Sequence, residues 1–183
     1  MSTHLLPDPC VTGASAVVDQ TADVDQTADG ITLNPYHAVV RGKVLAAFGG
    51  LSAHRSAPAL ALMAEDVQYT FEGEHALGGT RVSRAGVQRW FERLFRLLPG
   101  PFAIRSVEVR GYPWRTRVFT TFAHRVDPPR AASYWGSGVQ ITDLEWGRAR
   151  RIYTLVDTAR LVTTLAAMYA GGVTEAHAAP ILE

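Results

Sequence analysis

The sequence predicts one α+β domain, a cone-shaped α+β barrel in which a curved antiparallel sheet wraps around helices and encloses a central apolar pocket. Two observations predict it. The patterns along the chain are, in order, two helices, a strand, a helix rich in Trp and Phe, and four long strands. The strands alternate apolar and polar residues, as in a sheet with one buried face. A cone of this kind is open at one end, so we expect it to bind small hydrophobic molecules.

The first 33 residues are interpreted as a leader that precedes the domain. Residues 18–23 and 24–29 repeat the hexapeptide Val-Asp-Gln-Thr-Ala-Asp, and residues 1–40 hold five Asp and no Lys or Arg. A polar unit of six residues that is repeated once cannot bury a core. We therefore predict a disordered leader over residues 1–33, a single folded domain over 34–172, and a C-terminal tail over 173–183 that packs on the surface or frays.

Helix signals open the domain. Asn34-Pro35 combines a capping residue with proline at the first helical position. Apolar residues recur at helical spacing as far as Phe48, and Gly49-Gly50 is expected to end this helix. A second short helix is expected after Ser56. A strand follows over Asp66–Glu72, with one face formed by Val67, Tyr69 and Phe71.

The rest of the domain reads as a helix and four strands. Gly73 to Thr80 is expected to be a loop, and Ser83 to cap an amphipathic helix that ends at Pro99-Gly100-Pro101. Alternating segments predict strands over residues 102–110, 115–126, 133–146 and 148–156, with a hairpin turn at Trp146-Gly147. A last helix is expected from Asp157, which caps it, to about Ala170.

Composition excludes several classes of function. The formal net charge is +1 and the basic residues are scattered, so we expect neither a nucleic-acid nor a membrane partner. Cys10 is the single cysteine, which excludes an intrachain disulfide and a thiolate metal site. No apolar run reaches about 18 residues and no secretory signal is recognised, so a cytoplasmic protein is expected.

The motifs of phosphate, metal and nucleophile sites are not found. The sequence has no Gly-rich phosphate loop, no GxSxG and no HExxH. Glu72, Glu74 and His75 follow the first strand, and we interpret them as a solvated pocket rim because loop spacing alone does not make metal ligands converge. We therefore predict neither a cofactor nor a metal.

The order of elements over residues 35–170 resembles the nuclear-transport-factor-2-like superfamily, and within it the SnoaL-like polyketide cyclases and the related limonene-epoxide-hydrolase and ketosteroid-isomerase groups. The resemblance is carried by five stretches: 62–69, the helix around Trp90-Phe91, 136–144, Trp146-Gly147 and 153–157. It is more specific for fold than for function, because this fold hosts enzymes, transport factors and assembly modules. It also implies a homodimer that pairs through the outer face of the sheet.

The resemblance places the reactive positions of these families on residues that depart from them. The carboxylate on the last strand of the cyclases and epoxide hydrolases falls on Thr154, and a threonine is not a general base at neutral pH. The paired Gln/His site of the cyclases falls on Gly138 and Gln140. The isomerase base falls near Phe71, whereas Tyr69 matches a pocket tyrosine of the epoxide hydrolases.

The pattern of residues suggests a different pair, His124 and Tyr69, as the proton-transfer and hydrogen-bonding groups of the site. His124 lies by alternation on the same face as Phe122 and Val126, where an apolar surrounding keeps the imidazole neutral and basic. Tyr69 is a hydrogen-bond donor suited to a carbonyl oxygen or an enolate. Each of them could instead be a core residue with its polar atoms satisfied.

We expect a cofactor-free enzyme of secondary metabolism that acts on a hydrophobic, carbonyl-bearing small molecule of polyketide or terpenoid type. The reaction is cyclisation, isomerisation or dehydration through an enol(ate), with His124 and Tyr69 as catalytic residues. The alternatives are a non-catalytic small-molecule-binding or assembly module and, third, an epoxide hydrolase. The predicted substrate-binding residues are Gln140, Tyr134, Thr154, Phe71, Trp90 and Phe122.

Overall fold

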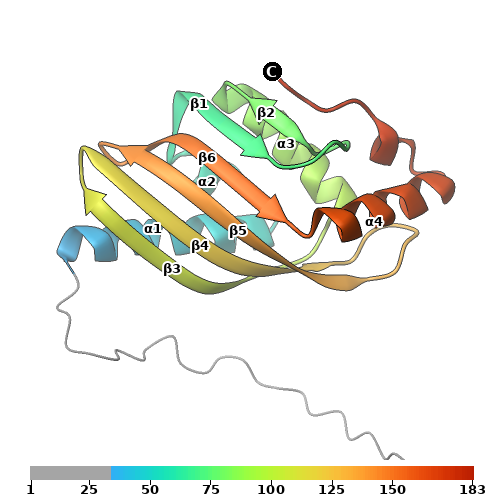
Figure 1. Cartoon of the computed structure of the whole chain (residues 1–183), viewed down its shortest axis with the longest axis horizontal. Coiled ribbons are helices and arrows are strands. Elements are labelled where there is room, and N and C mark those ends of the chain that lie inside the picture. Colours follow the sequence, from blue (N-terminus) through green and yellow to red (C-terminus); the bar gives the residue numbers. More distant parts are fainter. Residues whose placement is uncertain (1–33) are drawn as a thin grey trace, which may run out of the picture. The chain divides into compact units, whose positions relative to one another are not determined.

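The computed structural model describes residues 34–183, which form a six-stranded curved sheet with helices packed on it (Figure 1). The helices are α1 (Pro35–Ser52), α2 (Ala57–Leu60), α3 (Arg84–Leu97), α4 (Thr158–Ala170) and the 3₁₀-helix η1 (Thr174–His177). The strands are β1 (Met63–Phe71), β2 (Gly79–Arg81), β3 (Phe102–Tyr112), β4 (Arg115–Val126), β5 (Tyr134–Glu145) and β6 (Arg148–Val156). The predicted leader and its tandem repeat lie outside the described residues.

The sheet has the order β2-β1-β6-β5-β4-β3, which confirms the four-strand meander β3 to β6 and the α+β class. The expected curved, cone-shaped sheet is confirmed, and two details define it further. β1 pairs with β6 in parallel, so the sheet is mixed. β2 and β3 are free edges, so the sheet curves without closing into a barrel. Alternation along a sequence identifies strands, but it does not say which strands are neighbours or in which direction they run.

The segment Gly73–Thr80, predicted as a loop, contains the start of a strand. Residues 79–81 pair antiparallel with β1, with Phe71 opposite Gly79 and Tyr69 opposite Arg81. Three residues are too few to show alternation, which explains why the sequence did not reveal β2. β1 begins at Met63 instead of Asp66, with an irregularity in its pairing between Met63 and Gln68.

Helix α1 continues through Gly49-Gly50 and ends at Ser52, so the glycines do not stop it. A Cβ on Gly50 would lie 2.9 Å from the carbonyl oxygen of Arg55 and 2.8 Å from Cγ of Pro58. Glycine is therefore needed here for the close approach of the next turn and α2, not for a left-handed helix end.

The predicted helix caps are confirmed. The side chain of Asn34 accepts a hydrogen bond from the Tyr36 amide, Ser83 Oγ from Gly86, and Asp157 from Arg160. Each of these oxygens satisfies an amide that the first helical turn leaves without a partner. α4 starts immediately after β6, so its position is fixed by the sheet.

The core lies between the concave face of the sheet and the helices. The larger cluster joins α3, α4 and the end of α1 to β1 and β6, with Val67, Val87, Leu97 and Met168 fully buried. A smaller cluster fixes the start of α1 on the sheet through Val40, Val118 and Leu144. None of the helices in residues 34–183 has both the length and the hydropathy needed to cross a membrane.

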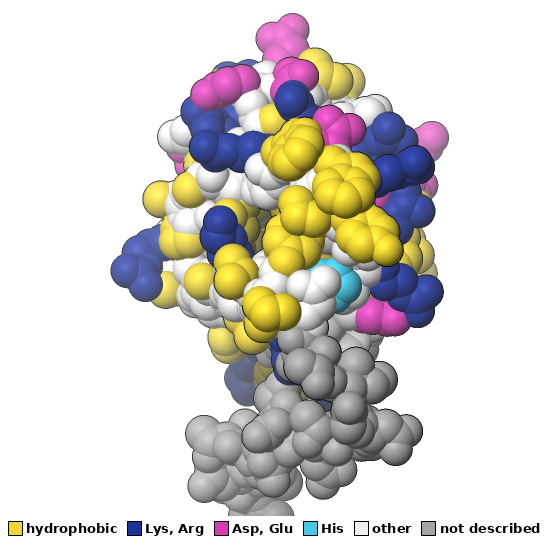
Figure 2. All heavy atoms as spheres, turned by 90° about the vertical axis from the view of Figure 1, so that its left-hand side faces the viewer, with side chains coloured by type: hydrophobic (Ala, Val, Ile, Leu, Met, Phe, Trp, Pro, Cys, Tyr) yellow, Lys and Arg dark blue, Asp and Glu magenta, His cyan; other side chains and the backbone are white. Residues whose placement is uncertain are grey.

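At one end of the sheet the β3–β4 and β5–β6 turns lie side by side, because the Trp146 amide donates to the Pro113 carbonyl over 2.8 Å. Three aromatic side chains are exposed here: Tyr112 by 62%, Trp114 by 55% and Trp146 by 75%. Figure 2 faces this end and shows hydrophobic side chains gathered among basic ones. Trp146 has a φ of 50°, in the left-handed region that is costly for a residue with a Cβ.

Candidate functional site

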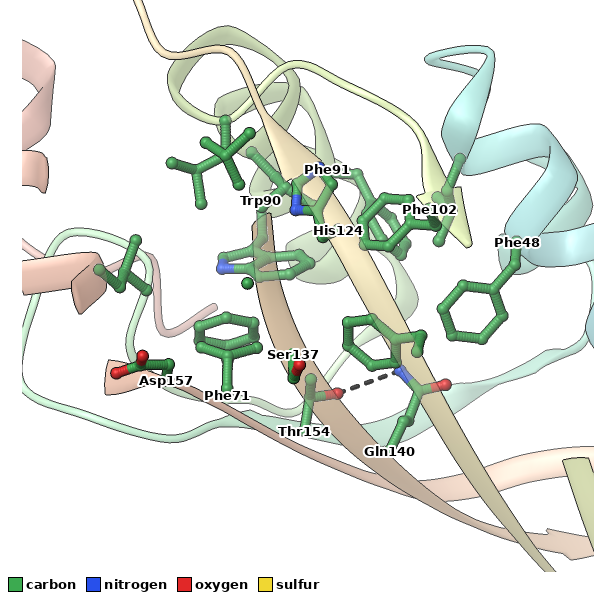
Figure 3. A pocket seen from close by; sticks show the side chains of 18 of the residues that line it. Phe48, Phe71, Trp90, Phe91, Phe102, His124, Ser137, Gln140, Thr154 and Asp157 are labelled. Atoms are coloured by element: carbon green, nitrogen blue, oxygen red, sulfur yellow. Dashed lines mark hydrogen bonds between the residues drawn. The ribbon is translucent and has the colours of Figure 1, made fainter. Parts of the chain in front are cut away.

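A cavity lies inside the cone between the sheet, α1 and α3 (Figure 3). It holds about 660 Å³ of space between atoms, with the solvent at its mouth included. All eight residues predicted for the site line it: Tyr69, Phe71, Trp90, Phe122, His124, Tyr134, Gln140 and Thr154.

His124 points inward from β4 and is 8% exposed. Its ring stacks on Phe102, with the centroids 4.0 Å apart and the planes at 10°. Nε2 lies 3.2 Å from the Gly100 carbonyl oxygen. Because a carbonyl only accepts hydrogen bonds, the proton is assigned to Nε2 and the lone pair to Nδ1. Burial lowers the pKa of His124 to about 4, so the imidazole is neutral near pH 7.

On β5, β6 and β1, three side chains form a directed chain of hydrogen bonds. The Gln140 amide donates to Thr154 Oγ1 over 3.0 Å, and Thr154 Oγ1 donates to the Tyr69 hydroxyl over 3.3 Å. Among the described residues this is the only hydrogen bond of the Tyr69 hydroxyl, so its own proton is free for a ligand. Burial raises the pKa of Tyr69 to about 12, which keeps this donor protonated at neutral pH.

The hydrogen bonds make Thr154 a relay between Gln140 and Tyr69, whereas the resemblance implied a reactive carboxylate at this position. Thr154 is 3% exposed and passes hydrogen-bond polarity from Gln140 to Tyr69. A threonine there cannot take a proton at neutral pH. The arrangement therefore supplies a polarised donor at one wall of the cavity and a neutral base, His124, at another.

Pairing across the sheet gives the separation of the backbone positions that carry the two polar groups. His124 lies opposite Gly136, and Gln140 lies four residues further along β5 and opposite Thr154. Four residues of a strand span about 13 Å. His124 and the Tyr69 donor therefore stand at different levels of the cavity, and a ligand that touches both has to be extended.

Aromatic rings form most of the wall between these levels. Phe48 of α1 contacts Phe102 and Phe122, with centroids 5.8 Å and 5.5 Å away. Gly138 lies opposite Phe122, and a Cβ on it would lie 2.4 Å from that ring. A side chain on residue 138 would therefore displace the Phe122 ring, which accounts for the glycine at this position.

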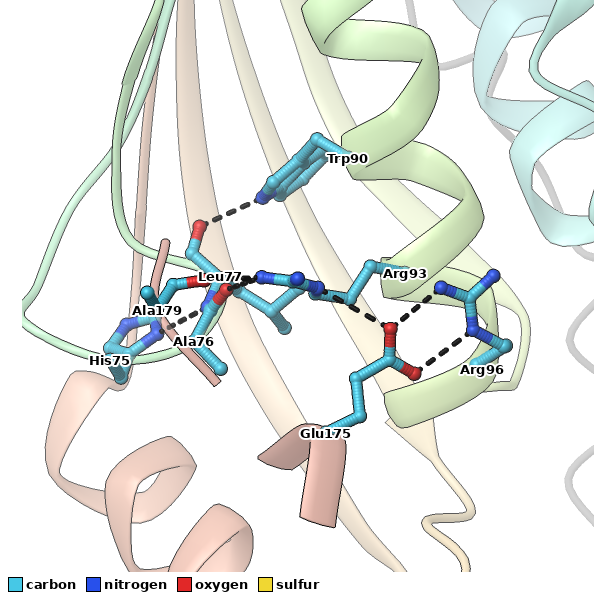
Figure 4. Close-up of polar contacts among 8 residues, drawn as sticks. All are labelled: His75, Ala76, Leu77, Trp90, Arg93, Arg96, Glu175 and Ala179. Carbon is cyan, nitrogen blue, oxygen red and sulfur yellow. Dashed lines mark hydrogen bonds and ion pairs between the residues drawn. The ribbon is translucent and has the colours of Figure 1, made fainter. Parts of the chain in front are cut away.

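Trp90 is fixed in the cavity wall by contacts behind it (Figure 4). Its Nε1 donates to the Leu77 carbonyl over 2.8 Å. Arg93 donates to the carbonyls of Ala76 and Ala179, at 3.1 Å and 2.7 Å, and Arg96 binds both carboxylate oxygens of Glu175. The last residues of the chain thus pack on α3 and hold the loop that carries Leu77.

The acidic cluster after β1 does not converge. Glu72 accepts a hydrogen bond from the Tyr153 hydroxyl at 2.8 Å, and His75 Nε2 lies 3.2 Å from the Glu72 carbonyl. Within residues 34–183 no three His, Cys, Asp or Glu side chains are grouped as metal ligands.

The sequence did not identify three further lining residues of interest, Ser137, Asp157 and Phe48. Asp157 is the single carboxylate among the described lining residues, and its side chain caps α4. Ser137 is on the opposite alternation phase from Gln140, so only the curvature at the end of β5 brings it to the mouth. Phe48 belongs to the predicted apolar stripe of α1, a signal that does not separate a core side chain from a cavity wall.

No family model and no curated protein matches this chain. Solved structures do match it. A ketosteroid isomerase-like protein from Erwinia carotovora atroseptica SCRI1043 is 13% identical, with a TM-score of 0.59 over 68% of this chain and 98% of that one. A protein from Jannaschia sp. CCS1, assigned as a SnoaL-like polyketide cyclase, is 15% identical, with a TM-score of 0.58 over 72% and 94%.

A third structure, TerC co-crystallised with polyporic acid, is 23% identical, with a TM-score of 0.55 over 68% of this chain and 96% of that one. These comparisons confirm the expected resemblance in fold, which is the nuclear-transport-factor-2-like fold. At such low identities they carry the fold alone, so the chemistry has to be argued from the cavity.

Proposed function

We propose that this protein binds a hydrophobic, carbonyl-bearing small molecule in the cavity and converts it, without a cofactor, through an enol(ate). The carbonyl oxygen accepts a hydrogen bond from Tyr69, and His124 Nδ1 takes a proton from carbon. The electrons of that C–H bond form the enol(ate), which Tyr69 stabilises. Return of the proton from His124 to another carbon gives isomerisation. Alternatively, the enol(ate) carbon attacks a second carbonyl of the same molecule, which forms a C–C bond and closes a ring, and the new alkoxide oxygen takes the proton back from His124.

The observation that carries this proposal is the hydroxyl hydrogen of Tyr69, which has no acceptor among the described residues. It stands at the end of the Gln140–Thr154–Tyr69 chain in an apolar cavity, where a hydrogen bond to a developing oxyanion is stronger than in water. The distance between Tyr69 and His124 adds a requirement. Because they act at different levels, the substrate carbonyl is conjugated, so that a carbon remote from the oxygen is acidic.

A second candidate function is non-catalytic binding, and one observation favours it. With a pKa of about 4, His124 is a weaker base than the optimum near pH 7. Under this alternative the same cavity holds its ligand unchanged, with Tyr69 and Gln140 as anchors. TerC supports the capacity of this fold to hold an organic molecule, since it is co-crystallised with polyporic acid.

Hydrogen–deuterium exchange separates the two functions. Conjugated ketones are incubated with the protein in deuterium oxide, and exchange at carbon is followed by NMR, together with the dissociation constant of each ketone. We expect His124→Gln to abolish the catalysed exchange and Tyr69→Phe to slow it by about 100-fold. His37→Gln and Tyr153→Phe are matched controls, because both side chains are outside the cavity. Binding without exchange in the wild type would establish the non-catalytic alternative.

We also propose that two copies pair through the outer face of β5 and β6. Val139 lies opposite Leu155, and Ile141 opposite Tyr153, on the face away from the cavity. Val139 is 40% and Leu155 44% exposed, an apolar surface of the kind that interfaces cover. Sedimentation equilibrium tests this: Leu155→Asp is expected to give a monomer. Val162→Asp, a substitution at a similarly exposed residue of α4, is expected to leave the dimer intact.

A further inference from the structure

The cavity continues beyond the polar residues, beneath α1. A second hollow shares part of its wall with the first, including Phe48, Tyr69 and Gln140, and extends to Val44 and Ile152. A third hollow shares Val44, Leu62 and Leu144 with the second and reaches Tyr36 and Gly147. The space between atoms is about 500 Å³ in the second and about 350 Å³ in the third, with solvent at their mouths included.

Helix α1 lines all three hollows in sequence order. Its last turns, Phe48 and Leu51, face the first hollow, Val44 and Ala47 the second, and Tyr36 the third. From residue 36 to residue 51 a helix rises about 22 Å. The three hollows therefore follow one another along a seam between α1 and the sheet, which begins at the proposed reactive site.

Small side chains leave the second hollow empty. Ala47 of α1, Ala59 of α2 and Ala149 of β6 line it and are all buried, where larger apolar residues would close the space. Its lining side chains with polar atoms are those of Tyr69, Gln140 and Thr142. Phe48 lines both the first and the second hollow, and a side chain can change rotamer without any movement of the backbone.

We infer that the site takes an elongated molecule, whose carbonyl-bearing end lies between His124 and Tyr69 and whose apolar tail passes Phe48 into the second hollow. This inference rests on the proposed function and names its substrate class: a carbonyl compound with a long, slender apolar chain. The tail loses its contact with water inside the second hollow. Its presence there explains why buried alanines, and not larger apolar residues, line that hollow beneath α1.

Straight-chain 2-alkanones are the probes, and their dissociation constants are measured by displacement of a fluorescent apolar dye. For the wild type we expect affinity to rise about fourfold per added methylene, through chains of about twelve carbons. Ala47→Phe fills the second hollow. This variant is expected to bind the shortest ketones with a dissociation constant within about twofold of the wild-type value. Its dissociation constant for the longest ketones is expected to be about tenfold higher or more.

Ala46→Phe is the matched control, since Ala46 is the neighbouring alanine on the exposed side of α1, and it is expected to bind every ketone like the wild type. Ala149→Leu fills the same hollow from β6 and replaces Ala47→Phe if that variant does not fold. If the affinity of the wild type stops rising at the same chain length as the affinity of the hollow-filling variants, the inference about the tail is overturned, but the proposed function is not. Failure of every 2-alkanone to bind, while the conjugated ketones bind, would also overturn the inference alone. Failure of both kinds of ketone to bind would overturn the proposed function as well.

Discussion

Acidification tests the environment of His124 directly. We expect the wild type to lose about 3 kcal/mol more unfolding free energy between about pH 7 and about pH 4 than His124→Gln does. The imidazole is buried, stacked on Phe102 and close to the Gly100 carbonyl. The replacement keeps an N–H donor for that carbonyl but cannot be protonated in this range.

The magnitude follows from the lowered pKa. Burial is the main cause; the Gly100 hydrogen bond and Asp127 raise the pKa, and His54 lowers it further. Because the folded pKa, about 4, is below the unfolded value of 6.5, the unfolded chain binds the proton first as the pH falls. The contribution of neutral His124 is complete above the unfolded pKa and is lost as the pH falls through the folded one. One pKa unit corresponds to about 1.4 kcal/mol, which gives about 3 kcal/mol in total.

Urea denaturation followed by far-ultraviolet circular dichroism, at several values of pH, measures the effect. His37→Gln is the control, because His37 also lies within hydrogen-bond distance of a glycine carbonyl but is outside the cavity, so this variant reports the effect of a His-to-Gln replacement elsewhere in the fold. Carboxylates titrate in all three proteins and cancel in the comparison. Equal losses in wild type and His124→Gln, within about 1 kcal/mol, would refute the buried, neutral assignment.

The remaining predictions concern stability and use urea midpoints at neutral pH. Trp146→Asn should stabilise the protein by about 1 kcal/mol, because asparagine tolerates the φ of 50° better. A loss of stability would mean that contacts of the Trp146 ring stabilise the fold by more than the backbone strain costs. Gly138→Ala should destabilise by about 1–3 kcal/mol through the Phe122 ring, whereas Gly42→Ala, with open space around it inside α1, should stabilise slightly. Asp157→Ala should cost about 1 kcal/mol by removing the α4 cap, and an unchanged midpoint would contradict that role.

Local signals in the sequence predicted the elements well because local chemistry determines them. Asn34, Ser83 and Asp157 cap helices through side chains that satisfy nearby amides, and the alternation of residues 115–126 matches β4. Expectations about positions that are determined by tertiary contacts were wrong in places. The sequence around Gly50 predicts a helix end, but in the structure this glycine allows α2 to approach α1 closely. That contact is between segments that pack together only in the folded domain, so the local sequence does not indicate it.

The candidate site shows the same division. Alternation predicted that His124 faces inward, since one face of β4 has to be buried. The hydrogen-bond chain from Gln140 to Tyr69 could not be predicted, because it joins three strands and depends on the parallel pairing of β1 with β6. Phe48 and Ala47 could not be distinguished from core residues, because the sequence does not reveal whether the space beside an apolar side chain is filled.

The place of β1 in the sheet also sets an order of events during synthesis. β1 lies between β2, which follows it closely, and β6, where Phe71 meets Thr154 near the end of the domain. The ribosome therefore releases the β1–β2 ribbon and α3 long before their remaining partner exists. Joining the two halves of the sheet closes a very long loop, a step that slows folding and leaves apolar strand surface uncovered until the last strand arrives.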